Sequence, residues 1–225
     1  MANKTKGAFT LAEVLITLVI IGIVAAMTIP TTIAKYKEKE KHAKVKKAYS
    51  TIANAMTRMT AAGGDYVFAI QQNDMDSMKD WFNTYLRPYL SISKVCYNNN
   101  NSDVGCWSPG RSKYMNGSDS KIGVGHARID FILNDGTTVD LDDFYEGEIW
   151  NTWGVRADAG MSMVIAFDIN GGRGPNVVGE DVFAVIFAKN SGIKPAYIDR
   201  TQSEREESCS PTGTGASCIL KYLQN

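Results

Sequence analysis

Oxygen-bearing side chains gather in the glycine-rich segment DINGGRGPNVVGED, residues 168–181, where they could hold a cation. Asp168, Asn170, Asn176 and Asp181 offer carboxylate and amide oxygens, and the glycines between them let backbone carbonyls turn inward, as Ca²⁺ requires. The spacing is not that of an EF-hand, because a glycine stands at the twelfth position in place of a glutamate. Two interpretations follow: a calcium site, or a turn-rich loop capped by its Asp and Asn side chains.

Four cysteines, Cys96, Cys106, Cys209 and Cys218, could form disulfides or bind a metal. Pairing each cysteine with its neighbour in sequence closes two short loops and suits an oxidising compartment, although four cysteines allow three pairings. Zinc fits less well, because neither spacing is C-x₂-C and no histidine lies nearby. Free thiols are the remaining alternative.

Residue types that carry catalysis are sparse. The chain has two histidines, His42 and His126, and it has no G-x-S-x-G, Walker, HExxH or CxxC pattern. The acids of DLDDFYEGE, residues 140–148, could form a glycosidase-like pair, but solvated turn charges explain them more simply. We therefore expect a protein that is not an enzyme.

The elements that would position these residues follow from the hydrophobic pattern. Residues 127–143, ARIDFILNDGTTVDLDD, alternate apolar and polar side chains on either side of NDG, which predicts a β-hairpin. Residues 161–167 and 181–187 are two further strand-like runs, so we expect an antiparallel sheet of about four strands. Residues 75–90 predict a short helix that is ended by Pro88.

The most apolar segment lies near the amino terminus. Residues 8–29 contain a single charge, Glu13, and as a helix rising about 1.5 Å per residue they cover roughly the 30 Å core of a bilayer. A secretory signal is one interpretation, with Val24 and Ala26 as the small residues that precede a single cleavage site. An uncleaved signal anchor is another. A signal is disfavoured because the run exceeds the roughly 7 to 15 apolar residues usual there, and because a carboxylate opposes insertion.

A second pattern follows, and it predicts an amphipathic helix over residues 31–62. Apolar residues recur there at three- and four-residue steps: Val45, Ala48, Tyr49, Ile52, Met56 and Met59. Gly63 and Gly64 end the pattern. Residues 9–30 and 31–62 together predict one helix of about 50 residues, roughly 80 Å long, whose second half packs on a head formed by residues 63–225.

The formal net charge is zero, but the charges are unevenly placed. Two lysines, Lys4 and Lys6, precede the apolar run, and seven follow it: Lys35, Lys37, Lys39, Lys41, Lys44, Lys46 and Lys47. If the first two mark the cytoplasmic side, the later seven lie outside, against the positive-inside tendency. A solvated face near lipid headgroups is the preferred interpretation of this cluster, ahead of nucleic-acid binding.

The sequence FTLAE, residues 9–13, after a short basic leader, resembles the start of type IV pilin and type II secretion pseudopilin precursors. The resemblance implies that a membrane peptidase removes residues 1–8 and that Phe9 is then N-methylated. Leaders in this superfamily normally end in glycine, whereas here Gly7 is followed by Ala8. Two scissile bonds therefore stay open, Ala8–Phe9 and Gly7–Ala8.

The resemblance also implies an α+β, pilin-like fold, with a long helix packed on a small antiparallel sheet, and roles in a filament for Glu13, Gly22 and Pro30 of that helix. Glu13 would pair with the new α-amino group of Phe9 in a neighbouring subunit. Such a buried ion pair mainly disfavours any packing register between neighbouring subunits in which one of the two charges has no partner. Gly22 and Pro30 stand where the superfamily tolerates bending or melting of the helix, and proline removes a backbone donor.

The implied function is that of a filament subunit in a pilus or a secretion pseudopilus. Its partners would be other copies, other pilins or pseudopilins, the prepilin peptidase, an inner-membrane assembly platform and the membrane, with the head outside the cytoplasm. Calcium in a head loop and a disulfide across a carboxy-terminal loop are both known in the superfamily. The alternatives are a monomeric membrane-anchored binding module and a competence pilin that captures DNA.

Overall fold

The computed structural model describes residues 9–64, 74–99, 105–107, 112–124, 127–157, 161–188 and 191–224. The chain divides into two compact units, residues 1–42 and 43–225, which are taken one at a time below. Helix α1 (Leu11–Ala61, 51 residues) begins in the first unit and ends in the second. Its end agrees with the predicted stop, because Gly63 adopts a positive φ of 82° that favours glycine.

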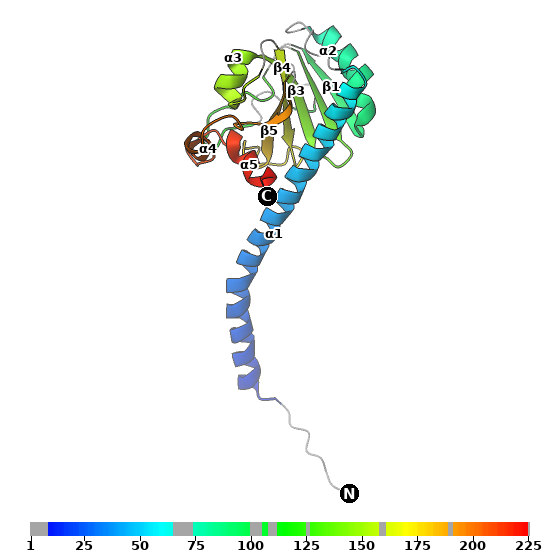
Figure 1. Cartoon of the computed structure of the whole chain (residues 1–225). Coiled ribbons are helices and arrows are strands. Elements are labelled where there is room, and N and C mark those ends of the chain that lie inside the picture. The colour runs from blue at the N-terminus through cyan, green and yellow to red at the C-terminus, as the bar shows by residue number, and fades with distance from the viewer. Residues whose placement is uncertain are drawn as a thin grey trace. The chain divides into compact units, whose positions relative to one another are not determined.

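A six-stranded antiparallel sheet forms the centre of the second unit (Figure 1). The strands follow one another in chain order: β1 (Ile92–Asn99), β2 (Ala127–Leu133), β3 (Thr138–Tyr145), β4 (Met161–Asp168), β5 (Val182–Ala188) and β6 (Gly192–Pro195). The predicted hairpin is β2–β3, and its turn contains Gly136 with a φ of 89°. The amide of Leu133 donates to the carbonyl of Thr137 at 2.9 Å and closes the turn.

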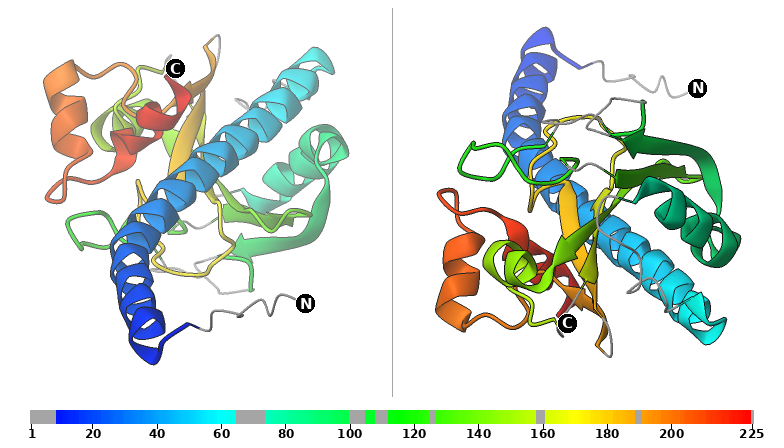
Figure 2. Two further views of the ribbon diagram at one scale, coloured as in Figure 1. Left: turned by 90° about the horizontal axis from the view of Figure 1, so that it is seen from below. Right: turned by 90° about the horizontal axis from the view of Figure 1, so that it is seen from above.

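The main core lies between α1 and one face of the sheet. The predicted stripe is buried at Val45, Ala48, Ile52, Met56 and Met59, together with Ala55. These side chains share one cluster with the inward residues of β2 to β5, with α2 (Met75–Trp81) and with α5 (Ile219–Leu223). Figure 2 shows this half of α1 crossing the sheet, with α2 and α5 on either side of it. Each fully buried Val, Ile, Met or Phe side chain of this core contributes about 1.5 to 3 kcal/mol of transfer free energy.

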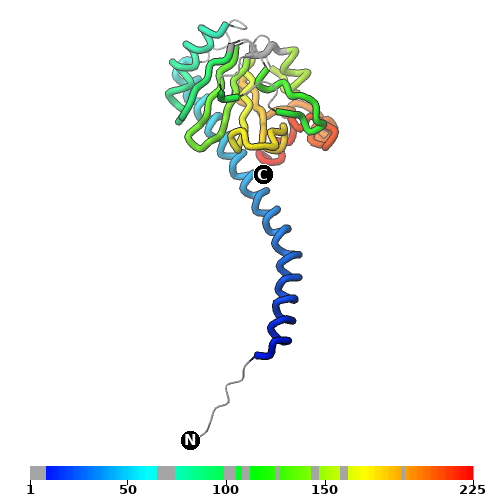
Figure 3. The backbone as a smooth tube through the Cα atoms, turned by 180° about the vertical axis from the view of Figure 1, so that it is seen from behind, coloured from blue at the N-terminus to red at the C-terminus, as the bar shows by residue number. Residues whose placement is uncertain are grey.

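The opposite face of the sheet is covered as well, by loops and short helices (Figure 3). Short elements on this side are α3 (Glu146–Glu148), η4 (Ile149–Trp153), α4 (Gln202–Ser208) and η5 (Ala216–Cys218). A second apolar cluster there includes Trp107, Trp153, Val164, Ala184 and Ile186. Because both of its faces are covered, β5 is buried along its whole length.

The predicted fold class is confirmed: a long apolar amino-terminal helix followed by an antiparallel sheet, with a pilin-like layout. The prediction of about four strands is wrong, because β1 and β6 form the two edges of the sheet. Edge strands are short or irregular, and β6 has four residues and ends in Pro195. The predicted helix over 75–90 is present as α2 followed by η2 (Phe82–Leu86) and η3 (Arg87–Tyr89).

Candidate functional sites

The first turn of α1 is capped by its own side chains. The hydroxyl and backbone amide of Thr10 both donate to Glu13 Oε2, at 2.7 and 2.8 Å, and the amide of Glu13 lies 3.3 Å from the Thr10 hydroxyl. This reciprocal arrangement is a capping box, which satisfies two otherwise unpaired amides at the start of a helix. The T-x-x-E spacing was visible in the sequence, but Thr10 was not predicted as a site residue.

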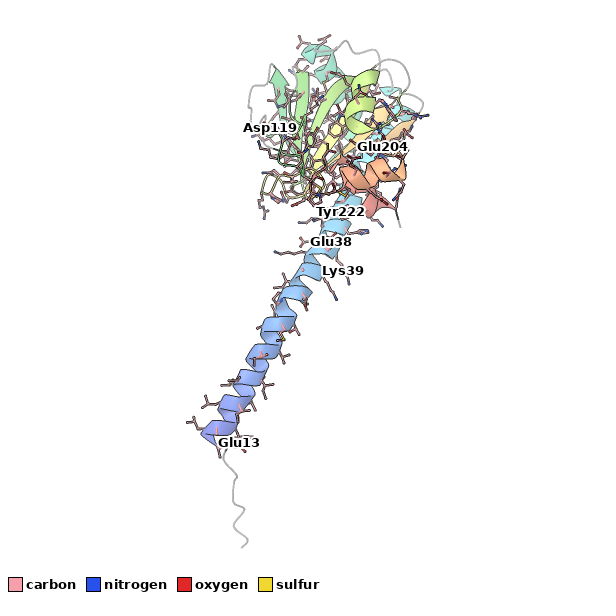
Figure 4. All side chains as sticks on the ribbon, turned by 90° about the vertical axis from the view of Figure 1, so that its left-hand side faces the viewer. Glu13, Glu38, Lys39, Asp119, Glu204 and Tyr222 are labelled. Atoms are coloured by element: carbon pink, nitrogen blue, oxygen red, sulfur yellow. A yellow bond between two sulfur atoms is a disulfide. The ribbon has the colours of Figure 1, made fainter. Side chains whose placement is uncertain are left out.

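The first unit exposes apolar side chains on all sides of the helix, with Glu13 at its amino-terminal end (Figure 4). Large apolar residues that are exposed there are Phe9, Leu11, Val14, Leu15, Ile16, Leu18, Val19, Ile20, Ile21, Ile23, Val24, Met27, Ile29, Ile33 and Tyr36. In the rest of the described chain Val124 is the one further large apolar residue of this kind. The helix is long and apolar enough to cross a membrane, and this is consistent with a membrane-anchored protein.

The other predicted assembly residues differ in how they are placed. Gly7 and Ala8, with the rest of the leader, lie outside the described residues, whereas Phe9 is 87% exposed. Helix α1 continues through both Gly22 and Pro30. A methyl group added at Gly22 would meet no atom within 4 Å, so packing among the described residues does not require a glycine there.

The predicted calcium ligands lie in the loop between β4 and β5. Asp168 Oδ1 accepts from the amides of Asn170 and Gly171, at 2.9 and 3.1 Å. Asp181 accepts from the Asn170 side-chain amide at 2.9 Å, and from the backbone amides of Asn176 and Val177 at 2.9 and 2.7 Å. These hydrogen bonds match one of the two interpretations drawn from the sequence, a turn-rich loop that is capped by its Asp side chains.

The same loop also keeps oxygen donors of the kind that calcium prefers. The Oδ1 atoms of Asn170 and Asn176 are buried without a hydrogen-bond partner. Hard oxygen ligands are what Ca²⁺ takes, so the donor types fit this ion. Within the described part of the chain, however, no three His, Cys, Asp or Glu side chains are grouped to hold a metal.

The cysteines form the two local pairs, Cys96 with Cys106 and Cys209 with Cys218. The Cys96–Cys106 disulfide links β1 to residues 105–107, which lie on the sheet face opposite α1. The Cys209–Cys218 disulfide closes the loop between α4 and α5. The structure therefore shows two disulfides and not a set of cysteine ligands for zinc. Of the two histidines, His42 is half-buried on α1 and His126 lies outside the described residues.

A charged cluster is buried on the sheet face that points away from α1. Ile129 of β2 belongs to the α1 core, so the period of two sends Arg128 and Asp130 to the other face. In the β2–β3 register Arg128 lies opposite Asp142, and Asp130 lies opposite Asp140. All four are buried, so the expectation of solvated turn charges at residues 140–148 is wrong for these two aspartates of β3.

Arg128 partly neutralises the cluster. Its Nη2 donates to Asp130 Oδ2 at 3.4 Å, and its Nε lies 3.7 Å from Asp140 Oδ1. The Asn98 side-chain amide also donates to Asp130. Burial, and then the adjacent Asp140 carboxylate, raise the pKa of Asp130 to about 10, and Arg128 offsets this only in part. Asp130 therefore carries a proton at neutral pH.

The loop that covers this cluster is fixed by backbone contacts to it. Arg128 Nη2 donates to the carbonyl of Trp107 at 3.4 Å, and the amide of Gly123 donates to Asp140 Oδ2 at 3.3 Å. A side chain at Gly123 would lie 2.6 Å from the Trp107 ring, so only glycine fits. The four charged side chains of the cluster are thus buried in this structure.

Comparison with known proteins identifies the amino-terminal segment. Residues 3–29 match a family model described as the prokaryotic N-terminal methylation motif, which is the signal of type IV pilins and pseudopilins. The predicted resemblance is therefore confirmed over this stretch. No curated protein and no solved structure matches the chain. The motif points to a structural subunit rather than an enzyme, and to assembly with other pilins and action of a prepilin peptidase.

Proposed function

We propose that this chain is a structural subunit of a type IV pilus-like or type II secretion pseudopilus filament. The observation that carries the proposal is the first half of α1. It begins with the methylation motif, exposes apolar side chains all round, and has Glu13 as its single charge before Lys35. A helix of this kind needs apolar surroundings along its whole length, which a bilayer provides before assembly and neighbouring helices provide afterwards.

The capping box suggests how Glu13 acts in assembly. Thr10 holds Oε2, and Oε1 makes no hydrogen bond to any part of the chain described by the structure. Removal of the leader before Phe9 creates an α-amino group one residue ahead of Thr10. In a filament, the amino group of an adjacent subunit could pair with Oε1, so Glu13 is held in place by Thr10 before it meets its partner.

The membrane arrangement follows from the same segment. We place the chain in the bacterial inner membrane as a single-pass protein, with Lys4 and Lys6 on the cytoplasmic side and the head outside the cytoplasm. The two disulfides are supporting evidence, because disulfides persist in oxidising compartments. An assembly platform would then move subunits from the membrane into the filament, to support secretion or pilus function.

A calcium ion in the β4–β5 loop is a second, separate part of the proposal. The unpartnered Oδ1 atoms of Asn170 and Asn176 support it, together with the carboxylates of Asp168 and Asp181. The ion would stabilise the loop and would take no part in chemistry.

The role of Glu13 can be tested with two substitutions that separate charge from helix capping. Glu13→Gln keeps a side chain that completes a capping box, whereas Glu13→Val removes both the cap and the charge. We expect both variants to be processed normally and both to be lost from sheared filaments, measured by immunoblot of the filament fraction against total protein. Wild-type incorporation of Glu13→Gln would contradict the pairing.

A further inference from the structure

A polar pocket of about 370 Å³ lies beside α4 in the second unit, and the filament proposal gives it no role. Its volume is within the roughly 300 to 1,000 Å³ typical of small-molecule sites. Its lining comes from a loop at Asn116, from the chain that follows β6, from α4 and from the loop after α4. Figure 4 labels Glu204 of α4, which belongs to this lining.

The pocket is preformed, because its walls are fixed to one another through the backbone. The amide of Asn116 donates to the carbonyl of Gly213 at 2.9 Å, which joins two of the lining loops. The capping box of Thr201 and Glu204 fixes the start of α4. A side chain at Gly213 would overlap the carbonyl oxygen of Glu207, so the loop after α4 lies directly against that helix. Fixed walls reduce the ordering that a ligand would otherwise have to impose.

A strained backbone conformation occurs in the same lining. Tyr197 adopts a φ of 64°, in the left-handed region that an aromatic residue rarely occupies. Its amide donates to the carbonyl of Trp153 at 2.6 Å, and its carbonyl accepts from Arg205 Nε at 3.1 Å, so neighbouring elements hold this conformation. Strained residues of this kind cluster at ligand sites. The strain therefore marks this pocket as a candidate binding site.

The charges of the pocket leave one carboxylate unpaired. Arg200 Nη1 lies 3.0 Å from Glu204 Oε1, so these two lining charges neutralise each other. Glu207 is exposed, and its carboxylate forms no ion pair or hydrogen bond with any residue that the structure describes. It is therefore available to accept from more than one donor of a ligand.

Neutral donors and acceptors complete the set. Asn116 Oδ1 accepts from the amide and the hydroxyl of Ser118, at 3.0 and 2.7 Å, which leaves Nδ2 of Asn116 as a donor. The Ser210 hydroxyl donates to the carbonyl of Glu207 at 2.7 Å. The Thr212 hydroxyl, 3.2 Å from that of Ser210, therefore donates to it and keeps its own acceptor sites. The pocket thus combines acceptors, a donor and an aromatic residue.

We propose that this pocket binds a neutral saccharide of one or two hexose units. Each sugar hydroxyl both donates and accepts, so adjacent hydroxyls can donate to the Glu207 carboxylate while another accepts from Asn116. The C–H face of a sugar ring is apolar and suits the aromatic residue Tyr197. An anionic ligand would be repelled by Glu207, and a purely apolar ligand would bury its carboxylate without a partner. The pocket lies within the second unit, so this inference does not depend on filament assembly.

The test is saturation-transfer NMR of the full-length chain in a detergent without sugar groups, titrated with maltose, cellobiose, lactose and N,N′-diacetylchitobiose. At least one of these sugars should bind. Glu207→Gln keeps the size of the side chain but removes its charge, and it should reduce the affinity for that sugar about tenfold. The matched control is Glu206→Gln, at the next and also exposed position of α4 but outside the pocket lining. It should change the affinity less than about twofold.

Asn116→Asp separates a saccharide site from a site for cations. The substitution keeps the oxygen that accepts from Ser118, but it replaces the Nδ2 donor by a negatively charged acceptor. The sugar should then bind about fivefold less tightly, whereas a cation site would become stronger. The sugar affinity should also be the same at roughly 0.1 and 1 M sodium chloride, because a neutral ligand is not screened. Binding of none of the four sugars, equal losses in Glu207→Gln and Glu206→Gln, or tighter binding by Asn116→Asp would overturn the proposal.

Discussion

Glu13 contributes to the free subunit as well as to the proposed filament, because it completes the capping box with Thr10. Thr10→Val removes the hydroxyl that donates to Glu13 and accepts from its amide, at a cost of about 1 kcal/mol to the first helical turn. We expect faster hydrogen–deuterium exchange confined to that turn, measured by mass spectrometry on the full chain in detergent. Thr10→Ser keeps the hydroxyl and should exchange like wild type. Equal exchange in Thr10→Val and wild type would contradict the cap.

Asp130 gives the head an unusual pH dependence. Its pKa is raised in the folded state, to about 10 from the ordinary 3.8, by burial and by the neighbouring Asp140. The folded state therefore holds the proton more tightly than the unfolded state, and the contribution is complete below about pH 4 and is lost as pH rises toward 10. The free energy of unfolding should fall with rising pH within this window, by at most about 1.4 kcal/mol per pH unit.

Asp130→Asn removes this titration, so it should flatten the slope and raise stability at pH 9 relative to wild type. Urea unfolding followed by tryptophan fluorescence at pH 5, 7 and 9 measures both effects. Asp135→Asn, at an exposed position, serves as the charge-matched control and should keep the wild-type slope. A wild-type slope in Asp130→Asn would show that Asp130 is not the group that holds the proton.

Asp181 stabilises the β4–β5 loop whether or not a metal ion binds there, because it accepts hydrogen bonds from backbone amides of the loop. Asp181→Asn keeps the size of the side chain but weakens its acceptance from the amides of Asn176 and Val177, so we expect lower thermal stability by a few degrees. If the proposed calcium ion binds, calcium should raise the melting temperature of wild type and not that of Asp181→Asn. Magnesium at the same concentration serves as the control. An unchanged wild-type melting temperature would leave the loop as a metal-free turn.

The sequence predicted those elements whose pattern is strong. The apolar run, the stripe from Val45 to Met59 and the NDG hairpin each have a clear period or turn signal, and all three are present. The edge strands β1 and β6 were missed, because exposed edges do not need alternating apolar residues. The buried cluster was missed because a row of aspartates reads as a solvated turn until the register places Arg128 opposite Asp142.

Site residues can be predicted from the sequence where their neighbours in sequence define them, and not where the fold brings together residues that are far apart in the chain. Glu13 stands out because a lone acid in an apolar run is costly, and it is interpretable from its neighbours in sequence. The pocket between α1, the β2–β3 turn and the β4–β5 loop could not be predicted, because it joins residues of α1 to turns that lie about 90 and 125 positions further along the chain. Its separate parts, a lysine cluster and two polar turns, each read as ordinary solvated surface.

At the scale of the whole molecule, the chain combines an apolar helix that needs neighbours with a head that has its own core. The lysines that follow the apolar run are balanced by a net acidic remainder, so that the total charge is zero. This combination of helix and head suits the proposed subunit, which is held in a membrane by its helix and later packs through that helix into a filament. Because the head has its own core, we expect it to fold in a chain that does not assemble.

The central claim is that the amino terminus is processed, and the intact mass of the membrane-associated protein tests it most directly. The protein is isolated from cells with and without the prepilin peptidase, and its amino terminus is sequenced. The account predicts loss of residues 1–8 and an N-methylated Phe9 only where the peptidase is present. Loss of residues 1–7 would move the cut to Gly7–Ala8 and keep the account. An unprocessed leader in both strains, or a new terminus at Met27, would contradict it.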